Sequence, residues 1–336
     1  MNPLGVLLIG PGWVAGQHIV SYLKNPATEI RAIAGHHPQD KDRAQVYMES
    51  HGFACPYYDD WESALQRDDI DLISICASNN QHYRMSLAAL EAGKHVLVEK
   101  PLCLSSSQLS KLLRAAGGAS VHTHVGHVAR YYPLLQRLWT FVRNGGIGDV
   151  FYCESDYWHE IKGPWKVATR TAGGSLLMGG CHSVDAVLWM VGDERKVEEV
   201  FAYTAKPRLR MDFEYDPTVS ILMKFDDGTI GRVSSSLECQ MPYVFHLQVN
   251  GTAGTIRNNG IFSRHFKNPK GFMRMHSDYP SGPDVQSHPF RREIDDFVSC
   301  IVKNRESQLS FRRAAPVYEV IFAAERSARE GTPIHL

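Results

Sequence analysis

Two glycines and an alanine follow a short apolar run near the start of the chain. Residues 4–9 have the composition of a buried parallel strand, and Gly10, Gly12 and Ala15 form a G-x-G-x-x-A pattern at its end. The first glycine permits a tight turn, the second lets the backbone approach a pyrophosphate, and the small alanine lets the next helix pack on the strand. Because free N–H groups at a helix N-terminus attract anions, the pattern predicts a dinucleotide-binding turn. A glycine-rich turn without a ligand is the alternative.

The residue that distinguishes NAD from NADP is expected about 20 residues further on, at the end of the second strand. The chain has Gly35 there, followed by His36 and His37. No carboxylate stands at that position, so nothing there repels the 2′-phosphate of NADP. His36, with Lys41 and Arg43 nearby, offers contacts to this phosphate. The sequence therefore favours NADP over NAD. The alternative is that NAD binds without the acid and the two histidines are simply exposed.

Composition limits the class of protein. The 336 residues include 36 Lys and Arg and 36 Asp and Glu, so the formal net charge is zero, which argues against nucleic acid and against membrane lipids as partners. Hydrophobic residues make up 43% and charged residues 21%, as in globular proteins. Seven scattered cysteines are typical of reduced thiols, and no apolar run approaches the roughly 20 residues of a membrane span. We expect a cytoplasmic protein.

Two further groupings of reactive side chains are set aside. His122, His124 and His127 lie close together, but only the first two share a strand face, and no Cys or carboxylate spacing completes a metal-ligand pattern. No metal site is therefore expected. Cys181 and His182 are adjacent on an expected helix and point in different directions, so they do not form a nucleophile pair.

The first part of the chain alternates strands with helices. Strands are expected at residues 4–9, 29–34, 71–77, 95–98 and 122–126, and helices at 14–24, 38–51, 80–92 and 106–116. This alternation predicts right-handed crossovers and a parallel sheet. The fold class is therefore α/β, with a Rossmann dinucleotide-binding domain over residues 1–125.

After residue 125 the pattern changes to an α+β arrangement with a largely antiparallel sheet. Helices are expected at 131–144, 175–190, 290–302 and 311–329, and strands at 150–157, 197–204, 220–225, 229–235, 245–249 and 252–256. Hairpin turns fit residues 226–228 and Asn250-Gly251. The polar stretch 258–287 is expected to be a surface excursion. This second domain covers residues 126–336, and its last helices are candidates to pack on the first domain.

Four blocks of sequence carry a resemblance to a known family. They are GPGWVAGQH at 10–18, ASNNQH through GKHVLVEKP at 77–101, GGS through GCHSVD at 173–185, and HPF through EIDDF at 288–297. In this order they resemble the Gfo/Idh/MocA oxidoreductases, the family of glucose–fructose oxidoreductase and inositol dehydrogenase. The resemblance implies a Rossmann domain and a C-terminal α/β domain for substrate binding and oligomerisation. The open sheet of such a domain often makes oligomer contacts, so a homodimer or homotetramer is expected.

The resemblance also implies which residues hold the NAD(P) cofactor. They come from the glycine turn and from the ends of later strands, with His36 added from the argument above. The set is Gly10, Gly12, Trp13, Val14, Ala15, His36, Ala77, Ser78, Asn79, His82, Glu99 and Lys100.

Lys100 and His182 are the catalytic residues that the resemblance implies. The lysine of the family's E-K-P motif corresponds to Lys100, and a cation at the reacting oxygen stabilises a developing alkoxide and can relay its proton. The family normally has an aspartate four residues before the histidine, but Met178 stands there and cannot take a proton. Three alternatives stay open: His182 acts alone with Lys100, another carboxylate substitutes, or the usual cycle is altered or lost.

Substrate contacts are expected mainly from the second domain. His159 and Tyr243 fit substrate positions of the family, Trp158 and Trp165 could stack on a sugar ring, and Arg130 and Lys166 could bind a carboxylate. The full expected set is Lys100, Arg130, Tyr157, His159, Trp165, Met178, His182 and Tyr243.

The function implied is NAD(P)-dependent hydride transfer between the nicotinamide C4 and a secondary alcohol or ketone of a sugar, cyclitol or related polyol. One alternative is an NAD-dependent glycoside hydrolase that oxidises the sugar transiently and eliminates the aglycone. The other is a non-catalytic dinucleotide-binding regulator. Met178 motivates both alternatives, whereas Lys100 and His182 argue against the regulator.

Overall fold

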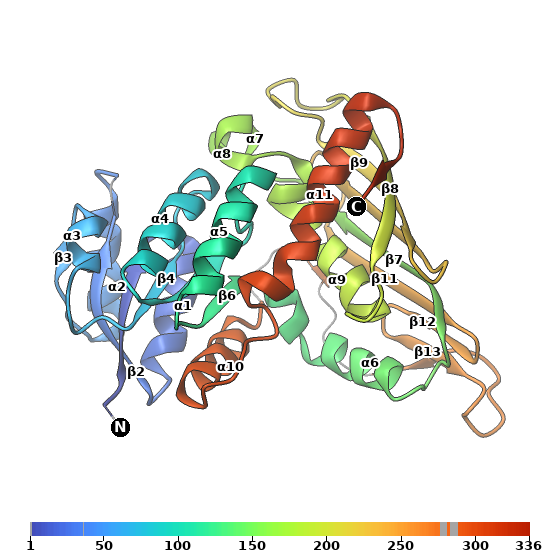
Figure 1. The fold of residues 1–336 in the computed structure, drawn as a ribbon, viewed down its shortest axis with the longest axis horizontal. Coiled ribbons are helices and arrows are strands. Elements are labelled where there is room, and N and C mark those ends of the chain that lie inside the picture. Colours follow the sequence, from blue (N-terminus) through green and yellow to red (C-terminus); the bar gives the residue numbers. More distant parts are fainter. Residues whose placement is uncertain (1, 36, 276–280, 283–287) are drawn as a thin grey trace. The chain divides into compact units, whose positions relative to one another are not determined.

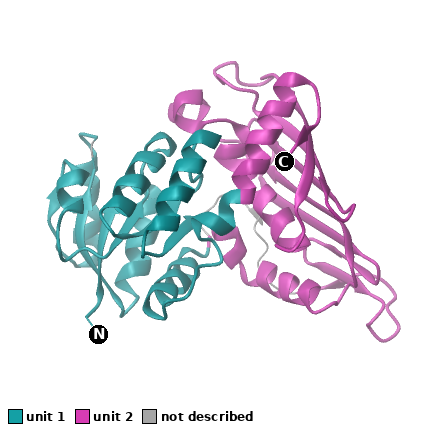
Figure 2. Ribbon diagram, viewed as in Figure 1, with its two compact units in different colours: residues 1–127, 289–315 teal, residues 128–288, 316–336 magenta. Residues whose placement is uncertain are grey.

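The chain folds into two compact units (Figures 1 and 2). The computed structural model describes residues 2–35, 37–275, 281–282 and 288–336. Unit 1 contains residues 1–127 and 289–315, and unit 2 contains residues 128–288 and 316–336. The single division expected at residue 125 therefore needs correction, because the segment 289–315 returns to the first unit.

Unit 1 is built on a six-stranded parallel sheet in the order β3-β2-β1-β4-β5-β6. The strands are β1 (Leu4–Ile9), β2 (Thr28–Ala34), β3 (Tyr57–Tyr58), β4 (Leu72–Ile75), β5 (His95–Glu99) and β6 (Thr123–Gly126). The order reverses between β1 and β4, and the carboxyl ends of strands at such a switch point are where open α/β sheets bind ligands. The predicted Rossmann fold is confirmed.

Helices cover the sheet of unit 1. They are α1 (Trp13–Leu23), α2 (Asp40–His51), α3 (Trp61–Leu65), α4 (Asn79–Glu91), α5 (Ser106–Gly118) and α10 (Phe290–Val302). Helix α10 packs beside α1, and Ile294 and Phe297 belong to the same buried apolar cluster as Ile19 and Tyr22. This packing explains why a segment so late in the sequence belongs to unit 1.

Unit 2 is built around one large sheet (Figure 1). This sheet has ten strands. Its path is β14-β13-β12-β11-β7-β10-β9-β8-β16, with β15 paired to β11. The strands are β7 (Val150–Trp158), β8 (Val197–Ala205), β9 (Thr218–Phe225), β10 (Ile230–Ser236), β11 (Tyr243–Gly251), β12 (Gly254–Arg257), β13 (Gly260–Ser263), β14 (Met273–Arg274), β15 (Ser281–Gly282) and β16 (Ile334–His335). Among the described strands of this second sheet, only β7 and β10 pair in parallel, so the predicted large, mainly antiparallel sheet is confirmed.

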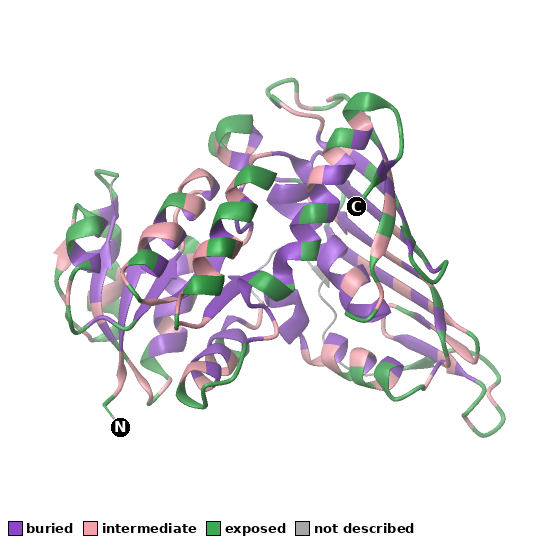
Figure 3. Cartoon of the chain, viewed as in Figure 1, coloured by how far each residue is buried: buried purple, intermediate pink, exposed green. Residues whose placement is uncertain are grey.

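One face of this sheet is covered and the other is open. In β9 the residues alternate between buried and exposed, which is the period of a strand with one face against a core (Figure 3). Helix α9 (Cys181–Val191) packs on β7 and β10. The stretch Thr169–Val191 is long and apolar enough to cross a membrane by length and composition, but 94% of its most apolar window is buried, as in a core helix.

The other helices of unit 2 are short, apart from α6 and α11. They are η1 (Val128–Tyr131), α6 (Pro133–Arg143), α7 (Pro164–Val167), α8 (Thr169–Ala172), the π-helix η2 (Leu176–Gly180) and α11 (Phe311–Glu330), whose first residues belong to unit 1. The single helix expected over 175–190 is therefore divided into η2 and α9.

Two expectations for the second sheet were wrong. Asn250 and Gly251 end strand β11, and the chain reverses over residues 252–253. Position 251 needs glycine for packing, because a β-carbon there would lie 2.3 Å from the carbonyl oxygen of Ile147. The stretch 258–287 is also more than an excursion, since β13 and β14 extend the sheet and Ile261 is buried. Residues 276–280 and 283–287 lie outside the described part of the chain.

Candidate active site

The glycine turn lies where three strands of unit 1 end. Gly10 has φ +85°, and a β-carbon there would lie 2.8 Å from the backbone nitrogen of Ala77. Its N–H donates to the carbonyl oxygen of Ala34 at 2.9 Å. Gly12 has an ordinary backbone conformation, and a β-carbon there would meet nothing within 4 Å. Gly10 is thus required by the fold, whereas Gly12 leaves space at the N-terminus of α1, where a pyrophosphate fits.

Tyr47 of α2 supports this turn. Its hydroxyl donates to the carbonyl oxygen of Gly12 at 3.0 Å. Its ring fills the space beside Gly16, where a β-carbon would lie 2.7 Å from it. Burial raises the pKa of the Tyr47 hydroxyl further above neutral pH. The sequence interpretation missed Tyr47, because nothing in the local pattern links a tyrosine on the second helix to the first turn.

The two glycines allow binding and folding to be tested separately. We expect Gly12→Ala to fold with wild-type stability, because the added methyl group meets no other atom. It should bind dinucleotide at least tenfold more weakly, because this methyl group enters the open space at the N-terminus of α1 where the pyrophosphate would bind. Gly10→Ala should lower stability as well, because it combines a positive φ with a backbone clash. Thermal unfolding and cofactor titration measure the two effects. Unchanged affinity in Gly12→Ala would contradict the assignment of the turn.

A carboxylate from α2 lies beside the end of β2, and the sequence interpretation did not foresee it. The side chain of Asp40 folds back from α2, and a β-carbon on Gly35 would lie 2.7 Å from its Oδ2. The N–H of His37 donates to the same oxygen at 3.0 Å. The premise that no carboxylate lies at this position is therefore corrected. His36 lies outside the described residues.

Glu99, at the end of β5, forms a buried pair with His18 of α1. His18 Nε2 lies 3.1 Å from Glu99 Oε1, and His18 Nδ1 lies 2.9 Å from the hydroxyl of Ser74. Burial lowers the pKa of His18, but Cys76 and Glu99 outweigh this and raise it well above its usual value. Burial raises the pKa of Glu99, but the hydrogen bond and charge of His18 lower it overall. Both directions favour a charged pair directly before Lys100.

His82 ties the ends of β4 and β5 together. Its Nδ1 lies 2.7 Å from the carbonyl oxygen of Pro101, and its Nε2 lies 3.0 Å from that of Ala77. Lys100 lies half-buried between Glu99 and Pro101. Unit 1 thus brings the strand-end members of the expected cofactor set to the carboxyl edge of one sheet. Trp13, Val14 and Ala15 lie in the first turn of α1, and Ser78 and Asn79 begin α4.

Unit 2 gathers four of the expected substrate residues into one cluster. Tyr157 and His159 lie at the end of β7, His182 begins α9, and Tyr243 begins β11. The ring of Tyr157 lies 6.1 Å from that of His182 and 5.4 Å from that of Tyr243. The Tyr157 hydroxyl is 3.1 Å from His159 Nδ1. The cluster offers imidazole and phenol groups together with aromatic faces.

Two further residues belong to this cluster, and the sequence interpretation missed both. The Tyr132 hydroxyl lies 2.6 Å from His288 Nδ1. The ring of His288 lies 6.5 Å from that of His182 and 6.4 Å from that of Tyr243. The fourth sequence block begins at His288, but block matching alone assigns it no role. We call these six residues the His–Tyr cluster: Tyr132, Tyr157, His159, His182, Tyr243 and His288.

Met178 lies in the π-helix η2, four residues before His182. It is 8% exposed, and the neighbouring Gly179 packs against the cluster, since a β-carbon there would lie 2.4 Å from the ring of Tyr157. π-helices of one turn are frequent at functional sites. None of the six cluster residues is a carboxylate, so imidazole and phenol are the proton-handling groups of the His–Tyr cluster.

Arg130 was expected to bind a carboxylate of the substrate. In the structure it binds a carboxylate of the protein. Its Nε and Nη2 donate to both oxygens of Asp185, with distances of 2.7–3.1 Å. Both residues are buried, and the guanidinium also lies 5.5 Å from the ring of Trp189. This bidentate pair occupies the planar fork of the arginine, so Arg130 is removed from the substrate set.

Lys166 and Trp165 lie next to each other on the short helix α7. Lys166 Nζ lies 5.6 Å from the Trp165 ring, and Trp165 is 42% exposed. Trp158 ends β7 and is half-buried. Trp165 and Lys166 therefore stay predicted substrate contacts.

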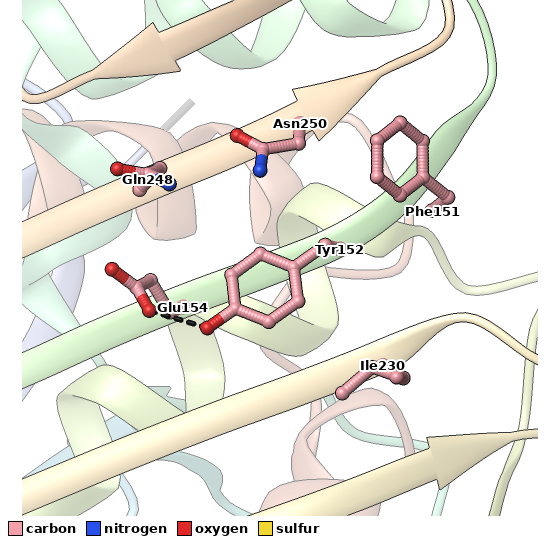
Figure 4. A pocket seen from close by; sticks show the side chains of 6 residues that line it. All are labelled: Phe151, Tyr152, Glu154, Ile230, Gln248 and Asn250. Carbon is pink, nitrogen blue, oxygen red and sulfur yellow. Dashed lines mark hydrogen bonds between the residues drawn. The ribbon is translucent and has the colours of Figure 1, made fainter.

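A separate depression of about 450 Å³ lies on the sheet of unit 2 (Figure 4). Phe151, Tyr152 and Glu154 of β7 line it, with Tyr152 donating to Glu154, and Ile230, Gln248 and Asn250 complete it. It shares no residue with the His–Tyr cluster.

The histidines near residue 124 hold structural partners. His124 Nδ1 lies 2.7 Å from the Ser307 hydroxyl, and His124 Nε2 lies 3.3 Å from Glu293. His122 contacts the side chain of Asn304. Among the described residues, no group of three or more His, Cys, Asp or Glu side chains is arranged to hold a metal ion.

A Rossmann unit with an open glycine turn at the N-terminus of its first helix is the arrangement that binds dinucleotides. Comparisons with known proteins give the class of protein. Residues 4–127 match the family model of the NAD-binding Rossmann fold, and residues 140–336 match that of the C-terminal alpha/beta domain of the same oxidoreductase family. The chain therefore belongs to the Gfo/Idh/MocA oxidoreductase family.

Similar proteins include both uncharacterised and named enzymes. The uncharacterized oxidoreductase YrbE of Bacillus subtilis is 25% identical over 98% of this chain and 95% of its own length. D-xylose 1-dehydrogenase (NADP(+)) 2 of Haloferax volcanii is 24% identical over 98% of both chains. The structure of levoglucosan dehydrogenase with NADH and levoglucosan superposes with a TM-score of 0.88 at 21% identity, over 100% of this chain and 99% of that one, which shows the shared fold.

Proposed function

We propose that the protein transfers hydride between a nicotinamide cofactor and a secondary alcohol or ketone of a sugar, cyclitol or related polyol. The observation that carries this proposal is the His–Tyr cluster. Its imidazole and phenol groups suit hydroxyl groups, and its ring faces suit the C–H face of a sugar. Relatives named D-xylose 1-dehydrogenase and myo-inositol 2-dehydrogenase support this substrate class.

The family resemblance assigns the two catalytic side chains of the proposed reaction. A bound nicotinamide supplies the hydride acceptor or donor. Lys100 stabilises negative charge on the substrate oxygen, and His182 accepts the hydroxyl proton during oxidation. The ring of Tyr157 lies beside those of His182 and Tyr243, and both tyrosines help to orient the substrate. Met178 supplies no proton and contributes an apolar wall.

Steady-state assays with a panel of cyclitols, aldoses and ketosugars test the proposal. The expected result is net reduction or oxidation of NAD(H) or NADP(H) with at least one member of the panel. Release of an aglycone without net change in cofactor would favour the glycoside hydrolase instead. Tight cofactor binding with no turnover, together with a copurifying partner, would favour the regulator.

Asp40 makes the choice between NAD and NADP testable. The preference for NADP stays a prediction, made because residue 35 is a glycine. The nearby carboxylate of Asp40 disfavours NADP binding, because a carboxylate repels a 2′-phosphate. We expect Asp40→Asn to tighten NADP(H) binding by roughly tenfold relative to NAD(H). Paired dissociation constants measure the ratio, with the exposed Asp42→Asn as control. An unchanged ratio would show that Asp40 serves only the local fold.

We also propose that the protein is cytoplasmic and that it assembles into a homodimer or homotetramer. Both stay predictions from composition and family resemblance. Size-exclusion chromatography with light scattering measures the assembly directly.

A further inference from the structure

We propose that a second depression in unit 2 binds a small organic carboxylate. This depression measures about 390 Å³ and is formed by residues 173–176, which lead into η2, by the facing ends of β8 and β9, and by the last turns of α11. We call it the α11 depression. It shares no residue with the His–Tyr cluster, and its binding role does not depend on the proposed function. Its titratable lining residues are Lys206, Tyr215, Asp216, Glu325 and Arg329.

Glu325 lines the depression with a half-buried carboxyl group. This group lies against residue 174, since a β-carbon on Gly174 would lie 3.3 Å from Glu325 Oε1. Within the described part of the chain, the carboxyl takes part in no hydrogen bond and in no ion pair shorter than 4 Å. Burial raises the pKa of Glu325 to about 7, and the positive charge of Arg329 opposes this rise. A carboxyl that keeps a proton near neutral pH can donate a hydrogen bond to a ligand.

The charges around Glu325 favour an anion. Lys206 Nζ lies 3.1 Å from Asp216 Oδ1, and the hydroxyl of Thr204 donates to Asp216 Oδ2 at 2.6 Å, so the charge of Asp216 is already balanced. Arg329 lies one helical turn beyond Glu325 and is exposed. No described carboxylate oxygen lies within 4 Å of its guanidinium. A guanidinium in this position can bind both oxygens of a ligand carboxylate.

The rest of the lining suits the organic part of such a ligand. Leu176 and Val219 contribute apolar surface. The hydroxyl groups of Tyr215 and Ser175 both donate to backbone carbonyl oxygens of residues outside the lining. Polar recognition in the α11 depression therefore comes mainly from Arg329 and Glu325. An arginine and a protonated carboxyl beside apolar walls together match an organic carboxylate.

Binding of a carboxylate is coupled to the proton on Glu325. The ligand is ionised near neutral pH, so a hydrogen bond between the two carboxyl groups needs a proton on Glu325. The other titratable groups that line the depression come from α11 (Arg329) and from the ends of β8 and β9 (Lys206, Tyr215 and Asp216), and residues 173–176 contribute none. Affinity should be complete below the pKa of Glu325 and fall as pH rises through about 7. We expect binding at pH 8 to be roughly tenfold weaker than at pH 6.

Isothermal titration calorimetry with small probes tests the class of ligand. Acetate, succinate and benzoate are the carboxylates, and benzylamine and benzyl alcohol are the cationic and neutral counterparts of benzoate. We expect at least one carboxylate to bind at pH 6, and benzylamine and benzyl alcohol to bind at least tenfold more weakly than benzoate. Absence of binding by all three carboxylates, or benzylamine that binds as tightly as benzoate, would overturn the proposal.

Two variants place the binding in the α11 depression. Arg329→Met should weaken carboxylate binding at least tenfold. Glu325→Gln should keep the affinity of the wild type at pH 6 within about threefold and lose the pH dependence, because an amide donates a hydrogen bond at every pH. Arg326→Met and Glu319→Gln are the matched controls, since both residues are exposed on α11 and lie outside the lining. Affinity and pH dependence that both test variants leave unchanged would overturn the site.

Carbon-13 spectra of the glutamate carboxyl groups follow the proton directly. The resonance that Glu325→Gln removes should titrate near pH 7 in the free protein, and a bound carboxylate should move its midpoint to higher pH. A midpoint that the carboxylate leaves unchanged, or moves to lower pH, would overturn the proposed coupling. Neither calorimetry nor these spectra need turnover, so their outcome is independent of the proposed function.

Discussion

Lys100→Met should lower kcat/KM about 10²- to 10⁴-fold at saturating cofactor, a larger loss than its effect on dinucleotide affinity. Methionine has a similar length but no charge, so it removes the group that stabilises the developing alkoxide. Lys100 is half-buried at the carboxyl end of β5, directly after the buried Glu99–His18 pair. Steady-state kinetics and dinucleotide titration of the same preparation measure the two effects.

Lys111→Met is the matched control for this loss. Lys111 is exposed on α5 of the same unit, so its replacement removes an equal charge without touching the carboxyl edge of the sheet. We expect wild-type kinetics from this variant. A Lys100→Met enzyme with more than about one tenth of wild-type kcat/KM would contradict the role assigned to Lys100.

Removing one partner of the Arg130–Asp185 pair should lower the free energy of unfolding by about 3–5 kcal/mol. Arg130 and Asp185 are 5% and 1% exposed, so Arg130→Met leaves a carboxylate buried without its counter-charge. Chemical denaturation of the purified variant measures the loss. Because Arg130 is removed from the substrate set, KM of the surviving folded enzyme should stay near that of the wild type.

The double variant Arg130→Met with Asp185→Leu separates the lost pair from lost packing. It removes both charges, so it should recover much of the stability that the single variant loses. Arg326→Met provides the exposed control, because its partner Glu330 lies one helical turn away on the surface of α11 and such pairs contribute less than about 1 kcal/mol. A single variant as stable as this control would contradict the buried pair.

Local chemistry made much of unit 1 predictable. The turn at Gly10 and Gly12 depends on a few consecutive residues, and the strands on either side are continuous apolar runs. The missed features depend on distant residues. Tyr47 braces the glycine turn from α2, and Asp40 occupies the space beside Gly35, and neither relation has a local pattern. The NADP argument was incomplete for this reason.

The same distinction applies to unit 2. Tyr157, His159, His182 and Tyr243 were predicted by family resemblance, and the structure gathers them into one cluster. Tyr132 and His288 were missed because 156 residues separate them and only the tertiary fold brings them together. Arg130 was misassigned because a cation in sequence does not show that Asp185, 55 residues further on, already binds it.

Direct hydride transfer is the central claim, and a deuterium-labelled substrate tests it most directly. A polyol found in the panel is labelled at its carbinol carbon, and the cofactor and product are analysed after one round of oxidation. The account predicts ketone and reduced cofactor in equal amounts, with the deuterium on the nicotinamide C4. Product formed without net reduced cofactor, or reduced cofactor that carries no deuterium, would contradict it.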